Sequence, residues 1–162
     1  MTIPEVLLCA IFLALALAAI AGFHHNFVTQ EKVADTRRLL ALLDRGMRVF
    51  EQKTGALPDV NAIEASPVVE VLLTEREVMD VLDDASVFLL YREDEGVECR
   101  DAWGTPIRYI PAAAATPALA RRIRLAGGRP IFESAGPDRD FGDAEPQRAS
   151  DNIASDEPTA GL

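Results

Sequence analysis

Cysteine, histidine and aromatic residues are scarce in this 162-residue chain, and each scarcity excludes a class of site. The two cysteines, Cys9 and Cys99, lie far apart and the first sits inside an apolar run, so we predict no disulfide framework. The two histidines, His24 and His25, are adjacent and would point about 100° apart on a helix, which does not suit a two-ligand metal site. No nucleophile stands out beside a base in the sequence, so we predict that the chain is not an enzyme.

Basic residues are fewer than acidic ones. The chain has 16 Lys and Arg against 26 Asp and Glu, for a formal net charge of −10. The basic residues do not form one cluster, so we predict no nucleic-acid partner. The acidic residues gather in two segments. The first, from Glu64 to Asp101, is expected to be a solvated surface, and the second begins at Glu133.

One long apolar run is present near the N-terminus. Residues 6–23 carry no charge, and as a helix rising about 1.5 Å per residue they nearly cross a ~30 Å hydrocarbon layer. We predict a single-pass membrane anchor over residues 1–28. The alternative is a signal peptide cleaved after Ala21, but no Lys or Arg precedes the run as a signal peptide requires.

Glu5, the one carboxylate at the start of this run, has two interpretations. It fits a capping box in which Thr2 caps the helix and Glu5 is its partner three residues on. It is also placed to pair, at the edge of a bilayer, with the terminal ammonium of a neighbouring subunit and so to fix the stagger between packed helices. The sequence leaves both roles open.

The helical pattern continues beyond the apolar run. Apolar residues recur at spacings of three, four or seven up to Lys53, and no breaker separates Phe23 from Thr29. We therefore predict one helix from about residue 3 to residue 53, ending at Thr54-Gly55. Its first half is predicted to lie in the membrane and its second half to form one wall of an extramembrane domain, residues 29–153.

The remainder predicts short helices and a small antiparallel sheet, which makes the fold class α+β. Ser66 is expected to cap one short helix, and Thr74 to open a second through a capping box. Residues 87–91 are expected to be a strand or apolar turn, followed by a charged connector up to Asp101. Residues 106–111 and 129–134 are predicted to pair as strands, separated by an alanine-rich insertion with a short helix. Residues 154–162 are predicted to be a disordered tail.

Aspartates among turn-forming residues follow the second strand. Clustered oxygen ligands on a folded-back loop suit a hard cation such as Ca²⁺, which takes ~6–8 oxygens. The spacing is not that of an EF-hand, and the alternative is an acidic, partly disordered tail. The candidate ligands are Asp138, Asp140, Asp143 and Asp151.

Taken in order, these elements resemble the major pseudopilin of type II secretion systems, a member of the type IV pilin-like class, over roughly residues 1–153. An apolar helix with a glutamate near its start leads to a Gly-x-x-Pro turn at residues 55–58. The most specific motif is Asp-x-Trp-Gly-x-Pro-x-x-Tyr, and a Ser-x-Gly-x-Asp segment leads into the acidic loop. The residues that carry these two motifs are Asp101, Trp103, Gly104, Pro106, Tyr109, Ser134, Gly136 and Asp138.

The resemblance implies a role as well as a pilin-like fold. It implies a structural subunit of a short periplasmic filament, anchored in the bacterial inner membrane with its C-terminal domain in the periplasm. Partners would be further copies, through the N-terminal helices with Glu5 at their start, and other pseudopilins or secretion components. It implies Ca²⁺ held by Asp138, Asp143 and Asp151, with Asp140 as a competitor. Because no basic leader precedes the run, the alternative is a membrane-anchored, calcium-binding module that does not polymerise.

Overall fold

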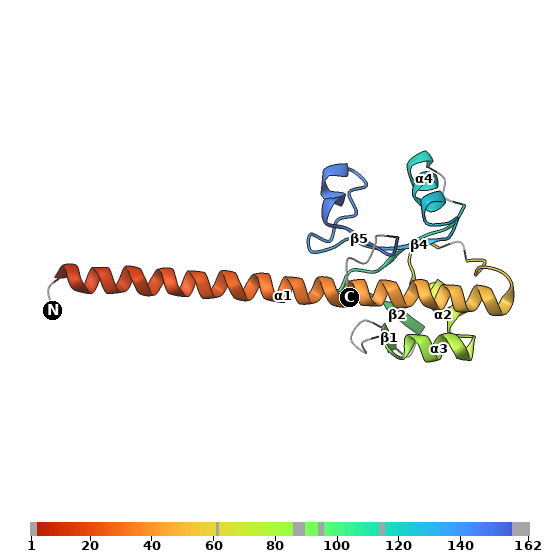
Figure 1. Cartoon of the computed structure of the whole chain (residues 1–162), viewed down its shortest axis with the longest axis horizontal. Coiled ribbons are helices and arrows are strands. Elements are labelled where there is room, and N and C mark those ends of the chain that lie inside the picture. The colour runs from red at the N-terminus through yellow and green to blue at the C-terminus, as the bar shows by residue number, and fades with distance from the viewer. Residues whose placement is uncertain (1–2, 61, 86–89, 94–95, 114–115, 157–162) are drawn as a thin grey trace. The chain divides into compact units, whose positions relative to one another are not determined.

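The computed structural model describes residues 3–60, 62–85, 90–93, 96–113 and 116–156, with the side chains of 3–10, 19–26, 90–93 and 146 excepted. It combines helices with two small antiparallel sheets, which confirms the predicted α+β class (Figure 1). The elements in chain order are α1 (Ile3–Thr54), α2 (Ser66–Leu72), α3 (Arg76–Leu82), β1 (Leu90–Glu93), β2 (Gly96–Cys99), β3 (Arg108–Ile110), α4 (Pro117–Leu125), β4 (Ile131–Ser134), the 3₁₀ helix η1 (Pro146–Asp151) and β5 (Ile153–Ala154).

Helix α1 has 52 residues, and its C-terminus lies within one residue of the predicted end. Gly55 stops it with a φ of +76°, and the Gly55 amide donates to the carbonyl of Glu51 at 2.9 Å. The chain divides into two compact units, Met1–Lys32 and Val33–Leu162, and α1 contributes residues to both.

The short helices α2 and α3 lie near their predicted positions, but the predicted caps do not form. The Ser66 hydroxyl accepts a hydrogen bond from the Cys99 amide at 3.1 Å, which joins α2 to β2. The Thr74 hydroxyl donates to the carbonyl of Val71 at 2.7 Å and so closes the end of α2. Helix α3 is instead preceded by Glu75, whose side chain makes no capping bond. Each hydroxyl therefore satisfies a backbone group outside the helix it was predicted to cap.

The segment predicted to be a charged connector contains a hairpin. Strands β1 and β2 pair antiparallel, with Leu90 opposite Cys99 and Glu93 opposite Gly96. The predicted apolar strand or turn at 87–91 lies mostly outside the described residues, which resume at Leu90. The charged residues Arg92, Glu93 and Glu98 favoured a connector in the sequence, because they interrupt the apolar pattern of both short strands.

The predicted pairing of the two later strands is confirmed. Strands β3 and β4 are antiparallel, with Tyr109 opposite Phe132, and β5 adds a third strand on the far side of β4. The segment 63–65 covers the other edge of β3: the Ala65 amide donates to the carbonyl of Ile107 and the Tyr109 amide to that of Ile63.

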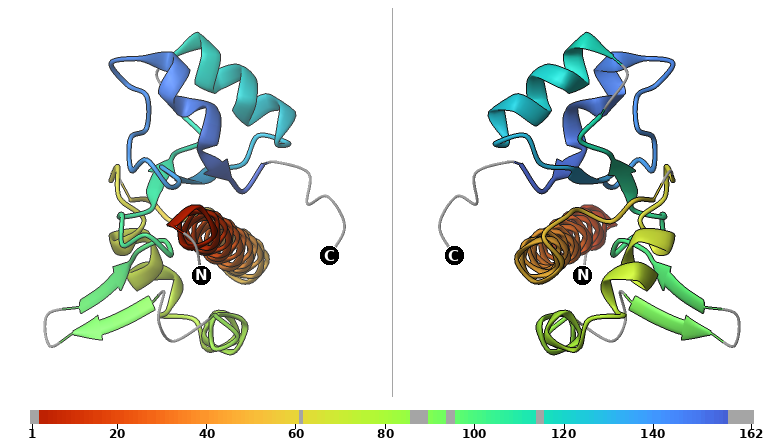
Figure 2. Two further views of the ribbon diagram at one scale, coloured as in Figure 1. Left: turned by 90° about the vertical axis from the view of Figure 1, so that its left-hand side faces the viewer. Right: turned by 90° about the vertical axis from the view of Figure 1, so that its right-hand side faces the viewer.

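Successive residues of the three-stranded sheet face opposite sides, and each side packs on a different helix. Tyr109, Phe132 and Ile153 belong to the main core, which also holds one face of α1 and the inner faces of α2 and α3. Ile110, Ile131 and Ala154 form a second cluster with Ile123 of α4. The alanine-rich insertion thus contains a helix, as predicted, and it covers the sheet face opposite α1. Figure 2 shows the sheet between α4 and the part of α1 that belongs to the second unit.

The predicted disordered tail begins too early in the chain. Ala154 lies in β5, and the Ser155 amide donates to the carbonyl of Phe132 at 2.9 Å. Asp156 forms an ion pair with Arg122 at 3.0 Å. The ordered part of the chain extends at least to Asp156, because β4 and Arg122, which are distant in sequence, bind this segment. Residues 157–162 lie outside the described part of the chain.

Candidate functional site

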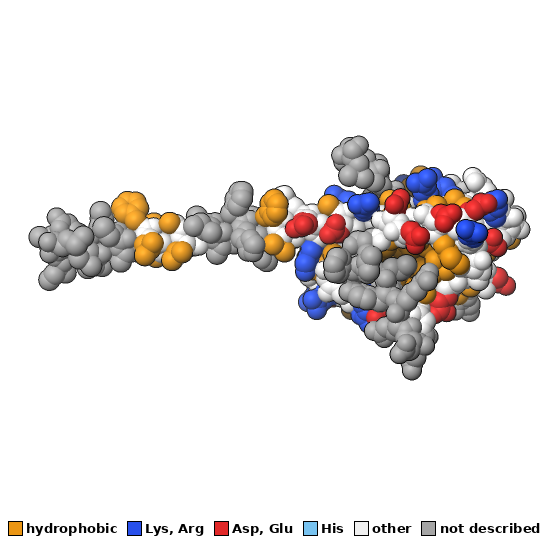
Figure 3. All heavy atoms as spheres, turned by 90° about the horizontal axis from the view of Figure 1, so that it is seen from below, with side chains coloured by type: hydrophobic (Ala, Val, Ile, Leu, Met, Phe, Trp, Pro, Cys, Tyr) orange, Lys and Arg blue, Asp and Glu red, His pale blue; other side chains and the backbone are white. Residues whose placement is uncertain are grey.

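The N-terminal unit presents apolar side chains to its surroundings. Ile11, Phe12, Leu13, Leu15 and Leu17 are between 54 and 65 % exposed, and Figure 3 shows them as an apolar stretch of the described surface. Soluble monomers rarely expose a contiguous apolar patch of this kind, and such patches mark contacts with lipid or with other protein chains. The side chain of Glu5, the predicted assembly residue, lies outside the described residues.

Among the residues that the structure describes, no helix has both the length and the hydropathy needed for a membrane span.

The residues of the tryptophan motif form a turn organised by one buried carboxylate. Asp101 is 3 % exposed, and its Oδ1 accepts hydrogen bonds from the amides of Trp103 at 2.9 Å and Thr105 at 2.8 Å. Its Oδ2 accepts a third bond, at 2.6 Å, from the Ser134 hydroxyl at the end of β4. Asp101 was expected to belong to a solvated acidic surface, and this is wrong, because all three donors reach it inside the fold.

The other motif residues complete this turn. Gly104 has a φ of +82°, a conformation that favours glycine, and the Gly104 amide donates to the carbonyl of Asp101 at 2.9 Å. Pro106 forms an isolated bridge with Arg100, and Tyr109 stacks at a tilt on Phe132 with ring centroids 5.6 Å apart. The Ala102 amide, beside Trp103, donates to the buried Thr36 hydroxyl of α1 at 3.2 Å. The motif therefore joins α1, the sheet and the loop that follows β4.

The acidic loop after β4 is built from local turns. The Asp138 carboxylate accepts from the Asp140 amide at 2.8 Å, and Asp140 accepts from the Gly142 amide at 2.9 Å. Gly136 has a φ of +71°, and a Cβ there would lie 2.3 Å from the carbonyl oxygen of Asp151. The loop thus returns closely on itself, and two of the predicted ligands already bond to its backbone.

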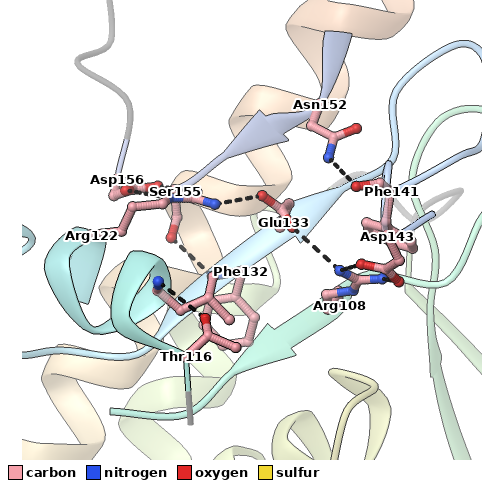
Figure 4. Close-up of polar contacts among 11 residues, drawn as sticks. Arg108, Thr116, Arg122, Phe132, Glu133, Phe141, Asp143, Asn152, Ser155 and Asp156 are labelled. Atoms are coloured by element: carbon pink, nitrogen blue, oxygen red, sulfur yellow. Dashed lines mark hydrogen bonds and ion pairs between the residues drawn. The ribbon is translucent and has the colours of Figure 1, made fainter. Parts of the chain in front are cut away.

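Arg108 of β3 holds the third predicted ligand. Its guanidinium donates to both oxygens of Asp143, at 2.9 and 2.5 Å, and lies 3.8 Å from the centre of the Phe141 ring (Figure 4). Bidentate arginine–carboxylate pairs have well-defined geometry, and the aromatic face adds a cation–π contact. The hydrogen bonds from Arg108 lower the pKa of Asp143 below its ordinary value of 3.8, burial opposes this, and the charge of Arg108 lowers the pKa further.

A second arginine, Arg148 of η1, forms an ion pair with Asp140, whose Oδ2 lies 3.1 Å from the guanidinium. Across the described residues, no group of three or more His, Cys, Asp or Glu side chains is placed to hold a metal ion. The oxygens of Asp140 and Asp143 accept from guanidinium and amide groups, so calcium would have to displace these donors to bind there. Guanidinium groups stand in the loop where a cation was predicted, and calcium binding stays a prediction.

Sequence reasoning missed a network of charges that extends from Arg108. Glu133 of β4 is buried and pairs with Arg122 of α4 at 2.8 Å, while its second oxygen lies 3.9 Å from Arg108. Arg122 also reaches Asp156 at 3.0 Å. Burial lowers the pKa of Arg122, but the hydrogen bonds and charges of Asp156 and Glu133 together outweigh it and raise the pKa. Figure 4 shows these side chains meeting over β4. The available signal was a carboxylate directly after the apolar pair Ile131-Phe132 in a predicted strand.

One further hollow, of about 280 Å³, opens beside this network between α1, α4 and β5. Of its charged lining residues, Arg48 pairs with Asp44, Asp156 pairs with Arg122 of the network, and Arg129 donates to the carbonyl of Ala126 at 3.5 Å. Because each of these charged groups already has a partner within the fold, the hollow does not by itself define a binding site.

Comparison with models of protein families, with curated proteins and with solved structures found no match to this chain.

Replacing Asp101 by Ala is expected to destabilise the C-terminal unit by about 3 kcal/mol or more, because three buried donors lose their acceptor. Asp101→Asn keeps the shape and one acceptor, so it should cost less. Urea unfolding of the full chain in detergent measures both, with the exposed Asp84→Ala as the matched control. Equal stability of Asp101→Ala and Asp84→Ala would contradict the assigned role.

Arg108→Gln is expected to raise the pKa of Asp143 back towards 3.8, because the hydrogen bonds that lower it are lost. The pKa of Asp143 is lower in the folded state than in the unfolded state. The stabilisation of the fold by the Arg108–Asp143 pair is therefore fully present above about pH 3.8 and is lost as the pH falls through the folded-state pKa. Carboxyl chemical shifts followed by NMR against pH measure the change. Arg121→Gln, on the exposed face of α4, is the control and should leave Asp143 unchanged.

Thermal melting of the wild-type chain with calcium or with chelator tests the predicted site, in which Arg108 and Arg148 already balance two of the carboxylates. A site that binds only the folded state would add about 2.7 kcal/mol at a hundredfold excess over Kd, or roughly 5–10 °C. Arg108→Gln/Arg148→Gln frees both carboxylates, and a calcium-dependent rise confined to this variant would show that guanidinium groups replace the ion. A rise in the wild type would instead support Asp138, Asp143 and Asp151 as ligands.

Proposed function

We propose that this chain is a structural subunit of a periplasmic filament of the pseudopilus type, belonging to a type II secretion-like system. Before assembly it is anchored in the bacterial inner membrane by the N-terminal part of α1, with the C-terminal unit in the periplasm. Its partners are further copies of itself and other subunits of the same class. The pilin-like resemblance of the tryptophan motif and of the elements around it motivates this proposal.

The observation that carries the proposal is the exposed apolar surface at residues 11–17. Exposing apolar surface to water costs roughly 25 cal/mol per Å², so burial of these side chains against lipid or protein is favoured. Lipid covers it in a membrane, and identical helices from neighbouring copies cover it in a filament. One surface therefore serves both states, and a subunit can pass from membrane to filament without refolding.

Lateral packing of apolar helices does not by itself set their relative height, because apolar contacts have no direction. Glu5, at the start of α1, supplies a charge that the terminal ammonium of a neighbour complements at one stagger. In a low-dielectric environment such a pair is favoured over a buried, unpaired carboxylate. This gives Glu5 a role in assembly that is separable from the stability of the C-terminal unit.

Cross-linking in native membranes tests this proposal. A Leu17→Cys chain, with Cys9 replaced by Ala, is expected to form disulfide-linked dimers, and Glu5→Gln in the same background should lower the linked fraction several-fold. Glu31→Gln, an exposed carboxylate of the same unit, is the matched control and should not change it. Deleting the gene should abolish the release of secreted proteins.

A chain that stays monomeric, together with normal secretion after deletion, would contradict the filament and favour an anchored binding module.

A further inference from the structure

Helix α4 lies in a segment of unusual charge. Residues 102–132 contain five arginines and no Asp or Glu, in a chain whose net charge is −10. Arg108 and Arg122 are neutralised within the fold, as described above. Arg121 and Arg124 are exposed, and neither has an ion-pair partner within the described residues. Two unpaired cations thus remain on the outer side of α4.

An apolar side chain accompanies these cations. Leu125 is 80 % exposed, and it follows Arg121 by four positions and Arg124 by one, so it shares the outer side of the last turn. We call Arg121, Arg124 and Leu125 the α4 surface. An exposed leucine flanked by arginines is typical of an interface in which an apolar contact is surrounded by charge.

Helix α3 presents the opposite charge. Residues 74–85 carry five acidic residues and one arginine. Asp80, Asp83 and Asp84 are exposed without an ion-pair partner in the described part of the chain, and Met79, which precedes Asp80, is 36 % exposed. We call these four residues the α3 surface. Figure 3 views the chain from the side of α3 and shows acidic and apolar side chains together there.

The two surfaces lie on opposite sides of the C-terminal unit. Figures 1 and 2 show α4 on one side of the α1 segment of this unit and α3 on the other. An isologous dimer through either surface would bring like charges together. Association of one surface with the other is heterologous, and heterologous contacts generate open polymers when they do not close into a ring.

We propose that the α4 surface of one copy docks on the α3 surface of the next copy, an interface that rests on the filament proposed above. The Arg121 and Arg124 guanidiniums face the carboxylates of Asp80, Asp83 and Asp84, and Leu125 packs against Met79. Two other occupants of the α4 surface are anionic lipid and nucleic acid. A second copy is favoured because the chain carries the complementary surface itself, while its net charge of −10 repels both of these polyanions.

Charge reversal of the full-length chain in detergent tests the interface, with self-association measured by sedimentation and filaments scored by electron microscopy. Arg121→Glu/Arg124→Glu and Asp80→Lys/Asp83→Lys are each expected to weaken self-association about tenfold or more, because like charges then meet. The combined four-residue variant is expected to regain it, a result that misfolding cannot produce. Arg37→Glu/Arg45→Glu places the same charge change on α1 and should have no effect.

Salt provides an independent measurement on the wild type. Raising it from about 0.1 M to about 1 M shortens the Debye length from about 10 Å to about 3 Å, so the association should weaken. Self-association that survives every reversal would overturn this interface and leave the filament standing. Absence of self-association in the wild type would overturn both. Loss of binding to anionic vesicles in Arg121→Glu/Arg124→Glu, with self-association intact, would assign the α4 surface to lipid and overturn the interface.

Discussion

The three hydrogen bonds to the Asp101 carboxylate are the interaction on which the C-terminal unit depends. Two come from the turn before β3 and one from Ser134, where the acidic loop begins. The same turn bonds to Thr36 of α1 through the Ala102 amide. A carboxylate inside an apolar core is tolerated only when its hydrogen bonds are complete, so helix, turn, sheet and loop must be in place together.

The sequence was sufficient where a pattern is local and repeated. The apolar period predicts the end of α1 to within one residue, and Gly104 with Pro106 marks the entry to β3. It was insufficient where order comes from distant partners. Strand β5 has two residues and is held by β4, and three of the eight residues in the β1–β2 hairpin are charged. Ser66 and Thr74 have the spacing of helix caps, but their hydroxyls serve other backbone groups.

In the acidic loop the same aspartates suit either a metal ion or guanidinium groups, and the ligand types alone do not distinguish the two. Its aspartates lie close together in sequence, as a calcium loop requires, yet Arg108 stands 35 positions before Asp143 and comes beside it only through the β3–β4 pairing. A guanidinium carries one charge and donates in a fixed plane, which suits one bidentate carboxylate; calcium attracts six or more oxygens, typically about 6–8. Both partners relieve the repulsion between carboxylates, but with different geometry. A guanidinium leaves each carboxylate paired with its own arginine, whereas calcium brings several carboxylates together around one point.

In the proposed filament, the affinity between subunits and the polarity of their assembly come from different parts of the chain. The apolar surface at residues 11–17 supplies a driving force that is large but non-directional, because lipid and neighbouring helices are equally apolar. Exposed ion pairs contribute little free energy, about 0–1 kcal/mol each, but they penalise wrong registers and wrong partners. Unlike charges on opposite sides of one compact unit then favour head-to-tail order over the symmetric pairing that an apolar contact alone would permit. A subunit so divided can rest in lipid as a monomer and still assemble with a single polarity.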